Sequence, residues 1–325
     1  MKDRLSESRG VYLGKVYLGA GGNGARRLVG ETDAASQVDA RKRKAVDEGV
    51  EIEEYRRMAA VEDAMWYYRA LHQHLERELT AGLGEGGRRW RRGTPSTGKT
   101  PAPPPRAENP PGQADRAMWQ ILDAGCGTGG LIRRLEPVHP EWRWTGVDVE
   151  PLACELARGR VARSEIVEAS VTALPFGDAS FDAVVSADVL YHLDDDALAL
   201  REYARVLRPG GRIVINVPAH RWLWSYHDVA VHGRRRYVRK ELRARLEAAG
   251  LQVNRLTHWN LLPLPLVIVR RKMLPAPRSG SDVRLYPQPV EAIFNGLMAV
   301  ERGGLRTLRS FPVGTSILAV ATKAD

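Results

Sequence analysis

Two hydrophobic spacings alternate along the chain after residue 118. Short apolar, β-branched runs predict strands, and longer segments with apolar residues three and four apart predict helices between them. The clearest helical patterns cover residues 194–207 and 238–249. The strand patterns cover residues 119–124, 142–147, 164–168, 181–186, 212–217, 252–258 and 316–321. This alternation predicts an α/β fold: a doubly wound, mostly parallel sheet with helices on both faces.

The region before this domain divides into three segments. Residues 1–52 mix glycines with charge runs, which predicts a disordered tail. Residues 53–83 carry apolar side chains at helical spacing, which predicts one amphipathic helix that acts as a lid. Residues 84–115 are rich in Gly, Pro and Arg, which predicts a linker. The remaining residues, 116–325, are expected to form the folded domain.

The linker contains a phosphate-loop pattern, Gly-Thr-Pro-Ser-Thr-Gly-Lys-Thr, at residues 93–100. A loop that cradles phosphates must leave a strand and enter a helix, because the helix N-terminal amides bind the anion. Arginines precede this pattern and four prolines follow within residues 101–105, so a helix cannot form there. We therefore interpret the match as accidental.

A glycine-rich turn follows the first predicted strand. Gly125, Gly127 and Gly130 fit the dinucleotide-binding pattern, and Asp148 follows Gly125 by 23 residues. A nicotinamide-dependent oxidoreductase is therefore one interpretation. Asp123, however, directly precedes the turn, and its carboxylate would repel a pyrophosphate while attracting a cationic ligand.

Three further motifs follow in order, at residues 173–186, 187–193 and 205–212. With the glycine turn, they make residues 119–218 resemble the class I S-adenosylmethionine-dependent methyltransferases, in particular the group similar to ubiquinone and menaquinone C-methyltransferases. The resemblance implies a seven-stranded Rossmann-like sheet whose last strand, 316–321, is antiparallel. It also implies S-adenosyl-L-methionine as cofactor and methyl transfer by direct displacement.

The resemblance assigns cofactor-binding residues position by position. Asp123 and the glycine turn would hold the methionine part, Asp148 the ribose hydroxyls, and Ala187 would border the transfer side. At Ser170 the family usually has an aspartate that binds the adenine amino group, so adenine anchoring here is expected to be weaker. The full predicted set is Asp123, Ala124, Gly125, Cys126, Gly127, Gly129, Asp148, Val149, Ser170, Val171, Ala187 and His192.

The acceptor is expected at loops that follow the fourth and fifth strands, since ligands bind at the carboxyl ends of parallel strands. His192, His227 and His232 are candidate general bases, because imidazole titrates near neutral pH. No further carboxylate or thiolate clusters with them in the sequence, so we predict no metal site. Candidate substrate-binding residues are Trp224, Tyr226, Arg235, Arg236 and Tyr237.

Charge is concentrated near the same loops. The 325 residues carry a net charge of +10, and residues 221–280 hold 13 Lys or Arg against 3 Asp or Glu, which accounts for all of it. This basic acceptor segment, 219–280, overlaps an insertion, 261–315, in which an apolar run abuts Arg270-Arg271-Lys272. We expect a helical cap there, and a small-molecule or lipid-linked, anionic acceptor.

The partners and location follow from these patterns. A cytoplasmic protein with peripheral contact at the inner face of the membrane is expected, without an obligate protein partner. Nucleic acid is disfavoured as a substrate, because the sequence has no stacking-aromatic repeat and no zinc module. Besides the oxidoreductase, a methyltransferase-like binding protein without catalysis remains an alternative, given Ser170 and the lack of an obvious base.

Overall fold

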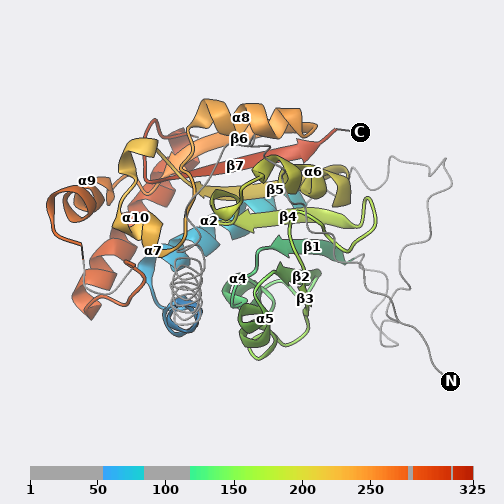
Figure 1. Ribbon diagram of the computed structural model, residues 1–325, viewed down its shortest axis with the longest axis horizontal. Helices are drawn as coiled ribbons and strands as arrows, with labels where there is room; N and C mark the ends of the chain where they lie inside the picture. Colours follow the sequence, from blue (N-terminus) through green and yellow to red (C-terminus); the bar gives the residue numbers. More distant parts are fainter. Residues whose placement is uncertain (1–53, 84–117, 277–280, 309, 325) are drawn as a thin grey trace, which may run out of the picture. The chain divides into compact units, whose positions relative to one another are not determined.

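One sheet of seven strands organises the computed structural model, which describes residues 54–83, 118–276, 281–308 and 310–324. The strand order is β3-β2-β1-β4-β5-β7-β6, and β7 alone runs antiparallel to its neighbours (Figure 1). The strands are β1 (Trp119–Ala124), β2 (Trp142–Asp148), β3 (Glu165–Glu168), β4 (Phe181–Ala187), β5 (Leu207–Pro218), β6 (Leu251–Trp259) and β7 (Ser316–Lys323). The predicted fold class is thereby confirmed, including the antiparallel last strand.

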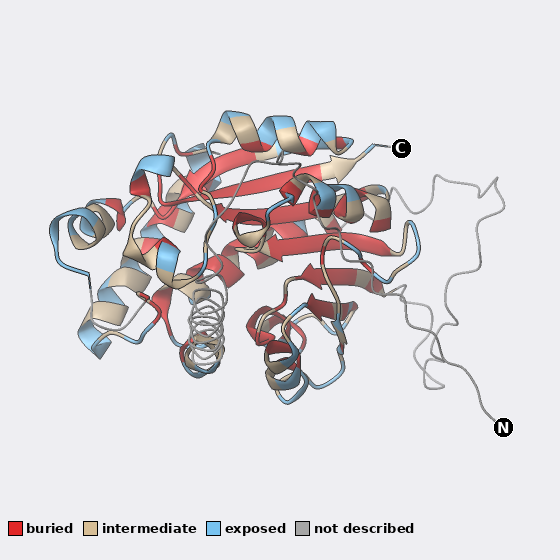
Figure 2. Cartoon of the chain, viewed as in Figure 1, coloured by how far each residue is buried: buried red, intermediate tan, exposed pale blue. Residues whose placement is uncertain are grey.

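Helices cover both faces of the sheet and enclose two hydrophobic cores. On one face the core includes buried residues of α2 (Trp66–Leu83), α4 (Gly130–Leu135), α5 (Pro151–Arg158) and α10 (Gln288–Leu308). On the other face it includes α6 (Asp196–Val206) and α8 (Arg239–Ala248). Buried residues run along the central strands (Figure 2), which explains their nearly unbroken apolar pattern.

The shorter helices lie in the loops and in the insertion. They are η1 (Leu190–His192), η2 (Arg221–Leu223), α7 (Tyr226–Ala230), α9 (Leu264–Ile268) and the π-helical turn η3 (Val269–Met273). The predicted tail (1–52), the linker (84–115) and its phosphate-loop pattern lie outside the described residues. Helix α10 lies within the insertion, where the sequence predicts a helical cap.

The predicted helix over residues 53–83 is two helices. Residues 54–61 are helical, the chain turns at 62–64, and α2 follows. The turn brings the Glu62 carboxylate to the glycine turn after β1, where the Thr128 hydroxyl donates to it at 2.6 Å. A continuous helix would lose this buried polar contact. Beyond the turn, α2 packs against α10, and Trp66 stacks on Phe294 with 4.7 Å between ring centroids.

Candidate functional site

The glycine turn connects β1 to α4 at the carboxyl edge of the sheet. Gly125, Gly127 and Gly129 have φ angles of +88°, +51° and +79°, which side chains with a Cβ rarely adopt. A Cβ on Gly125 would come within 2.2 Å of Val189 Cγ2, and one on Gly127 within 3.0 Å of Met58 Cε. The turn therefore needs glycine both for its backbone angles and for close approach of its neighbours.

Asp148 ends β2 beside this turn and points its carboxylate at it. The backbone N–H of Gly127 donates to Asp148 Oδ2 at 2.8 Å, and that of Glu150 donates to Oδ1 at 3.0 Å. Burial raises the pKa of the Asp148 carboxyl above its ordinary value, against these lowering hydrogen bonds. Each oxygen keeps a second acceptor position. The pair of oxygens therefore fits two neighbouring hydroxyls, as on a ribose.

Asp123 is the second carboxylate of the site. It is buried in β1, and among the residues that the structure describes none donates a hydrogen bond to its side chain. Burial, with smaller contributions from Asp148 and Glu62, raises the pKa of Asp123 to about 7. A buried carboxylate without a donor is costly unless a cation compensates it. The position therefore fits the ammonium group of an amino acid and disfavours a pyrophosphate.

The other predicted cofactor residues line the same edge in different ways. Ala124 and Val171 are buried, whereas the Val149 side chain is exposed beside Asp148. Burial raises the pKa of the Cys126 thiol, which keeps it protonated. The Ser170 hydroxyl lies 2.7 Å from Thr172 Oγ1 and accepts from the Thr172 N–H. Ser170 thus stabilises its own turn, in keeping with a smaller part in adenine recognition.

The N-terminal segment contacts the glycine turn, which the sequence patterns did not reveal. Met58 lies against Gly127, and the Glu62 carboxyl lies where a Cβ on Gly130 would stand. Arg160 and the Thr128 hydroxyl hold that carboxylate. Helical periodicity identified the helix but could not show which strand loop it would cover.

A second polar cluster, the Asp188 cluster, lies at the ends of β4, β5 and β6. Asp188 has a φ of +54° and follows Ala187, and its carboxylate accepts from the Tyr67 hydroxyl at 2.8 Å and from Asn216 Nδ2 at 2.9 Å. Trp259 Nε1 donates to Asn216 Oδ1 at 2.7 Å and stacks on Tyr67. Burial raises the pKa of Asp188 to about 6. A carboxylate on the predicted transfer side was thus missed by sequence reasoning.

The three predicted histidines occupy different surroundings. His192 lies with Nδ1 3.4 Å from the carbonyl oxygen of the exposed His232, and burial lowers its pKa to about 4. His227 accepts from the backbone N–H of Asp282 at 3.1 Å, and burial lowers its pKa well below the ordinary value. His192 and His232 therefore meet in one loop pair, whereas His227 contacts the C-terminal insertion. Their catalytic roles stay predictions.

Two of the predicted substrate residues are buried, which corrects the expectation for Tyr237 and leaves that for Arg236 a prediction, since Arg236 also lines a pocket. Tyr237 is fully buried, and its hydroxyl donates to Asp196 Oδ2 at 2.5 Å. Arg236 is buried and forms two hydrogen bonds to Asp228, at 2.7 and 3.1 Å. Both side chains stabilise the loop after β5, because their polar groups are already satisfied. Tyr226 is also engaged, since its hydroxyl donates to Asp282 at 2.7 Å.

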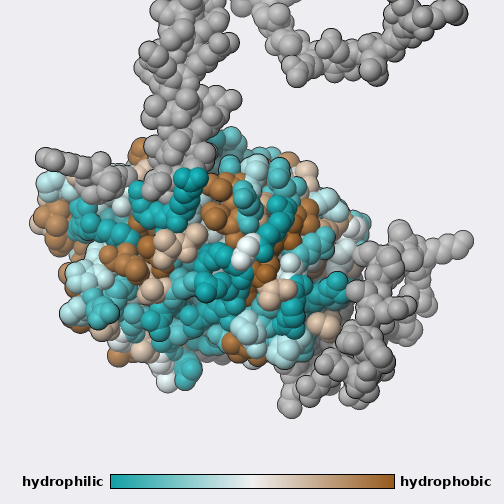
Figure 3. Space-filling view, turned by 90° about the horizontal axis from the view of Figure 1, so that it is seen from below, coloured by the Kyte–Doolittle hydropathy of each residue, from teal (hydrophilic) through white to brown (hydrophobic). Residues whose placement is uncertain are grey.

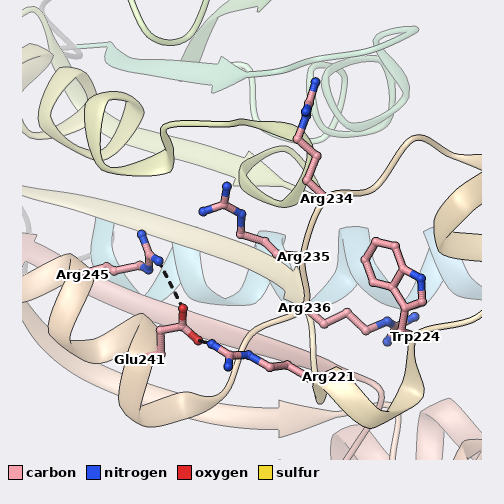
Figure 4. A pocket seen from close by; sticks show the side chains of 7 residues that line it. All are labelled: Arg221, Trp224, Arg234, Arg235, Arg236, Glu241 and Arg245. Carbon is pink, nitrogen blue, oxygen red and sulfur yellow. Dashed lines mark hydrogen bonds and ion pairs between the residues drawn. The ribbon is translucent and has the colours of Figure 1, made fainter.

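The remaining predicted residues, Trp224 and Arg235, line a pocket of about 440 Å³ rich in guanidinium groups (Figure 4). Arg235 comes from the loop after β5 and donates to the carbonyl oxygens of Leu193 and Asp194. Arg221 and Arg245 both pair with the carboxylate of Glu241. The lining residues are Arg221, Trp224, Arg234, Arg235, Arg236, Glu241 and Arg245. Each of the five arginines also pairs with a carboxylate.

Comparison with known proteins identifies the class. Residues 122–215 match the family model of a methyltransferase domain. This segment contains the glycine turn, Asp148, Ser170 and Asp188. The resemblance predicted from the four motifs is confirmed over these residues, which match a methyltransferase domain.

Individual relatives are similar over about a third of the chain. An O-methyltransferase of Penicillium expansum is 39% identical over 101 residues, which are 29% of this chain and 36% of that protein. The malonyl-[acyl-carrier protein] O-methyltransferase of Hahella chejuensis is 41% identical over 116 residues, 35% of this chain and 41% of that protein. The chain thus spans well under half the length of these relatives. Among solved structures, the YcgJ protein of Bacillus subtilis is 20% identical, covering 65% of this chain and 94% of its own, with a TM-score of 0.44.

Proposed function

We propose that this protein is an S-adenosylmethionine-dependent methyltransferase that acts on a small molecule. The proposal rests above all on the two carboxylates that flank the glycine turn, Asp123 and Asp148. Asp148 would accept hydrogen bonds from the ribose hydroxyls, and Asp123 would bind the ammonium group of the methionine part. When bound, the cofactor supplies a methyl carbon made electrophilic by the adjacent positive sulfur.

The chain's own residues would align the acceptor and exclude water. Met58 and Glu62 close over the glycine turn, so residues 54–83 fit the role of a lid. At the opposite side of the turn, Asp188 is fixed by Tyr67 and Asn216. With a pKa near 6, Asp188 is ionised at neutral pH and could receive a proton from a hydroxyl acceptor. We favour it over the three histidines as the base.

An anionic or lipid-like acceptor is the finer part of the proposal. The arginine pocket lies in the loop after β5, close to the loop 192–194 that follows β4. Guanidinium groups bind carboxylates and phosphates with paired hydrogen bonds. The relative from Hahella chejuensis is named for a malonyl group, which is carboxylated. We propose by analogy that a carboxylate or phosphate of the acceptor enters this pocket.

Calorimetric titration with S-adenosylmethionine tests the cofactor assignment, with NADH as the competing ligand. We expect saturable binding of S-adenosylmethionine and none of NADH. The Asp123→Asn variant should weaken binding by about tenfold, since one charge-assisted interaction contributes about 1.5–3 kcal/mol. Binding of NADH alone, or S-adenosylmethionine binding that Asp123→Asn leaves unchanged, would refute the proposal.

A further inference from the structure

An exposed apolar stripe runs along the C-terminal insertion. Leu262, in the turn before α9, is followed at spacings of four, three and four residues by Leu266 in α9 and by Val269 and Met273 in η3. This is the spacing of one helix face. All four are exposed, with Leu266 at 55% and Met273 at 72% of full exposure. A soluble helix normally turns such a face toward a core, so this stripe lacks a partner within the described part of the chain.

Helix α10 carries a second apolar surface. Ile293 and Val300 are 61% and 69% exposed, and they lie seven residues apart on the same face. Between and beyond them, a Cβ on Gly296 or Gly303 would meet no atom within 4 Å, so this face is open. The opposite face of α10 is buried through residues such as Met298. Figure 3 shows apolar surface on the side of the molecule where Figure 1 places α9 and α10.

The charges beside the stripe have one sign. Residues 261–276 contain three Lys or Arg and no Asp or Glu. Lys272 is exposed, with its ammonium group 2.7 Å from the carbonyl oxygen of Trp224. Arg270 lies over the Tyr226 ring, 5.1 Å from its centroid. Asp282, the first acid to follow, already accepts from Arg271 at 3.0 Å and from Tyr226. Within the described residues the apolar stripe is therefore flanked by three cations and one carboxylate, because Asp282 pairs with both Arg270 and Arg271.

We propose that this stripe docks on an anionic bilayer surface, with Leu262, Leu266, Val269 and Met273 entering the boundary between headgroups and acyl chains. Apolar side chains next to basic ones fit such a surface, because the apolar side chains enter the acyl boundary while the basic ones bind the anionic headgroups. A second copy of the chain fits less well, since pairing the stripes would bring like charges together. Within the described residues no helix is long and apolar enough to cross a membrane, so contact would be with one leaflet.

The docking surface extends the proposed function, because a protein bound to a bilayer can reach a lipid-linked acceptor. The link to that acceptor rests on the proposed function, whereas the membrane contact itself does not. The four apolar side chains of the stripe line neither the glycine turn nor the arginine pocket, although the flanking Lys272 contacts Trp224 at the pocket. Vesicle binding and cofactor binding are therefore measurable independently, and failure of one leaves the other intact.

Vesicle co-sedimentation of the full chain tests the proposal. The vesicles are phosphatidylcholine alone, or phosphatidylcholine mixed with phosphatidylglycerol. We expect binding to the anionic vesicles at least about tenfold stronger than to the neutral ones, and weaker binding as salt rises. The double variant Leu266→Gln/Met273→Gln should lose about tenfold or more of this affinity, because two exposed apolar side chains no longer enter the bilayer.

A matched control separates the stripe from general surface hydrophobicity. Val138 is 59% exposed but lies after α4, outside the insertion, so Val138→Gln should bind vesicles like the unchanged protein. Retained calorimetric binding of S-adenosylmethionine and an unchanged melting temperature show that each variant is folded. Equal binding to both vesicle types, or an unaffected double variant, would overturn the proposal. So would a dimer in sedimentation that the double variant abolishes, since a second copy would then cover the stripe.

Discussion

The two halves of the sheet's carboxyl edge differ in chemistry. At β1 and β2, buried carboxylates, Asp123 and Asp148, surround a turn that carries no cation of its own. At the loop after β5, five guanidinium groups line a pocket, and each of them pairs with a carboxylate. The family model matches residues 122–215, so it includes the first half and stops before the second. The part that would bind the cofactor therefore lies within the residues that the methyltransferase model matches, whereas the loop after β5 lies beyond them.

Of the substitutions that test this comparison, removal of the Asp148 carboxylate should have the largest effect on cofactor affinity. Asp148→Ala deletes both proposed ribose contacts and the acceptors for Gly127 and Glu150 N–H groups. We expect S-adenosylmethionine affinity to fall by about 100-fold or more, from about 1.5–3 kcal/mol for each charge-assisted bond. Calorimetry measures it. Glu155→Gln, an exposed charge change on α5, is the control and should leave the affinity unchanged.

Alanine substitutions at two glycines distinguish the cost of a steric clash from the cost of backbone strain. Gly125 and Gly250 both have positive φ, at +88° and +80°, but only Gly125 has a neighbour in the way, Val189 Cγ2 at 2.2 Å from the added Cβ. Gly250→Ala should cost about 1 kcal/mol of unfolding free energy through strain alone. Gly125→Ala should cost more and weaken cofactor binding by about tenfold. Urea unfolding and calorimetry provide both numbers, and equal costs would remove the steric argument.

The pKa of Asp123, about 7, predicts a pH dependence of cofactor binding. The ammonium group binds the ionised carboxylate, so affinity should rise about fivefold between pH 6 and 7, as Asp123 loses its proton. Stability changes in the opposite direction. The folded protein holds this proton at pH values where the unfolded chain has lost it, so the free energy of unfolding falls as pH rises from about 4 to 7.

Asp123→Asn is the test of both trends. The variant should bind S-adenosylmethionine more weakly but with a flat pH profile in this range, and its unfolding free energy should lose the corresponding slope. A profile that keeps its slope would assign the titration to another group, with Asp148 the nearest alternative.

The smallest effect is expected in the arginine pocket. Arg235→Gln leaves its neighbours Arg221, Arg234 and Arg245 in place, so affinity for a small dicarboxylate should fall only about threefold. Calorimetry with malonate measures this, and Arg243→Gln, which pairs with Glu247 on the exposed side of α8, is the control. Loss of affinity in the control alone would mean that the anion binds elsewhere.

The sequence predicted the sheet closely for a physical reason. The central strands β1 and β4 are buried on both faces, so their apolar runs identify them, and β1 has the predicted bounds. The glycine turn, Asp123 and Asp148 follow one another along neighbouring strands, so local motifs were sufficient to find them. Ser170 was also recognised as a departure from the family pattern.

Contacts between distant segments could not be predicted from local patterns. The Tyr67 hydroxyl meets Asp188 across 121 residues, and no periodicity reports such a contact. Likewise, the break at residues 62–64 follows from the meeting of Glu62 with Thr128. Tyr237 was predicted to contact the substrate, but it is buried in the core. The local sequence around an aromatic residue does not show whether its side chain faces a ligand or the core.

Transfer of labelled methyl from S-adenosylmethionine into a fractionated cell lysate tests the central claim most directly. Label should enter the small-molecule or lipid fraction with the unchanged protein, and Asp148→Ala should abolish it. Absence of transfer from a protein that binds the cofactor would support a binding protein without catalysis. Label confined to the nucleic-acid fraction would contradict the proposed acceptor class.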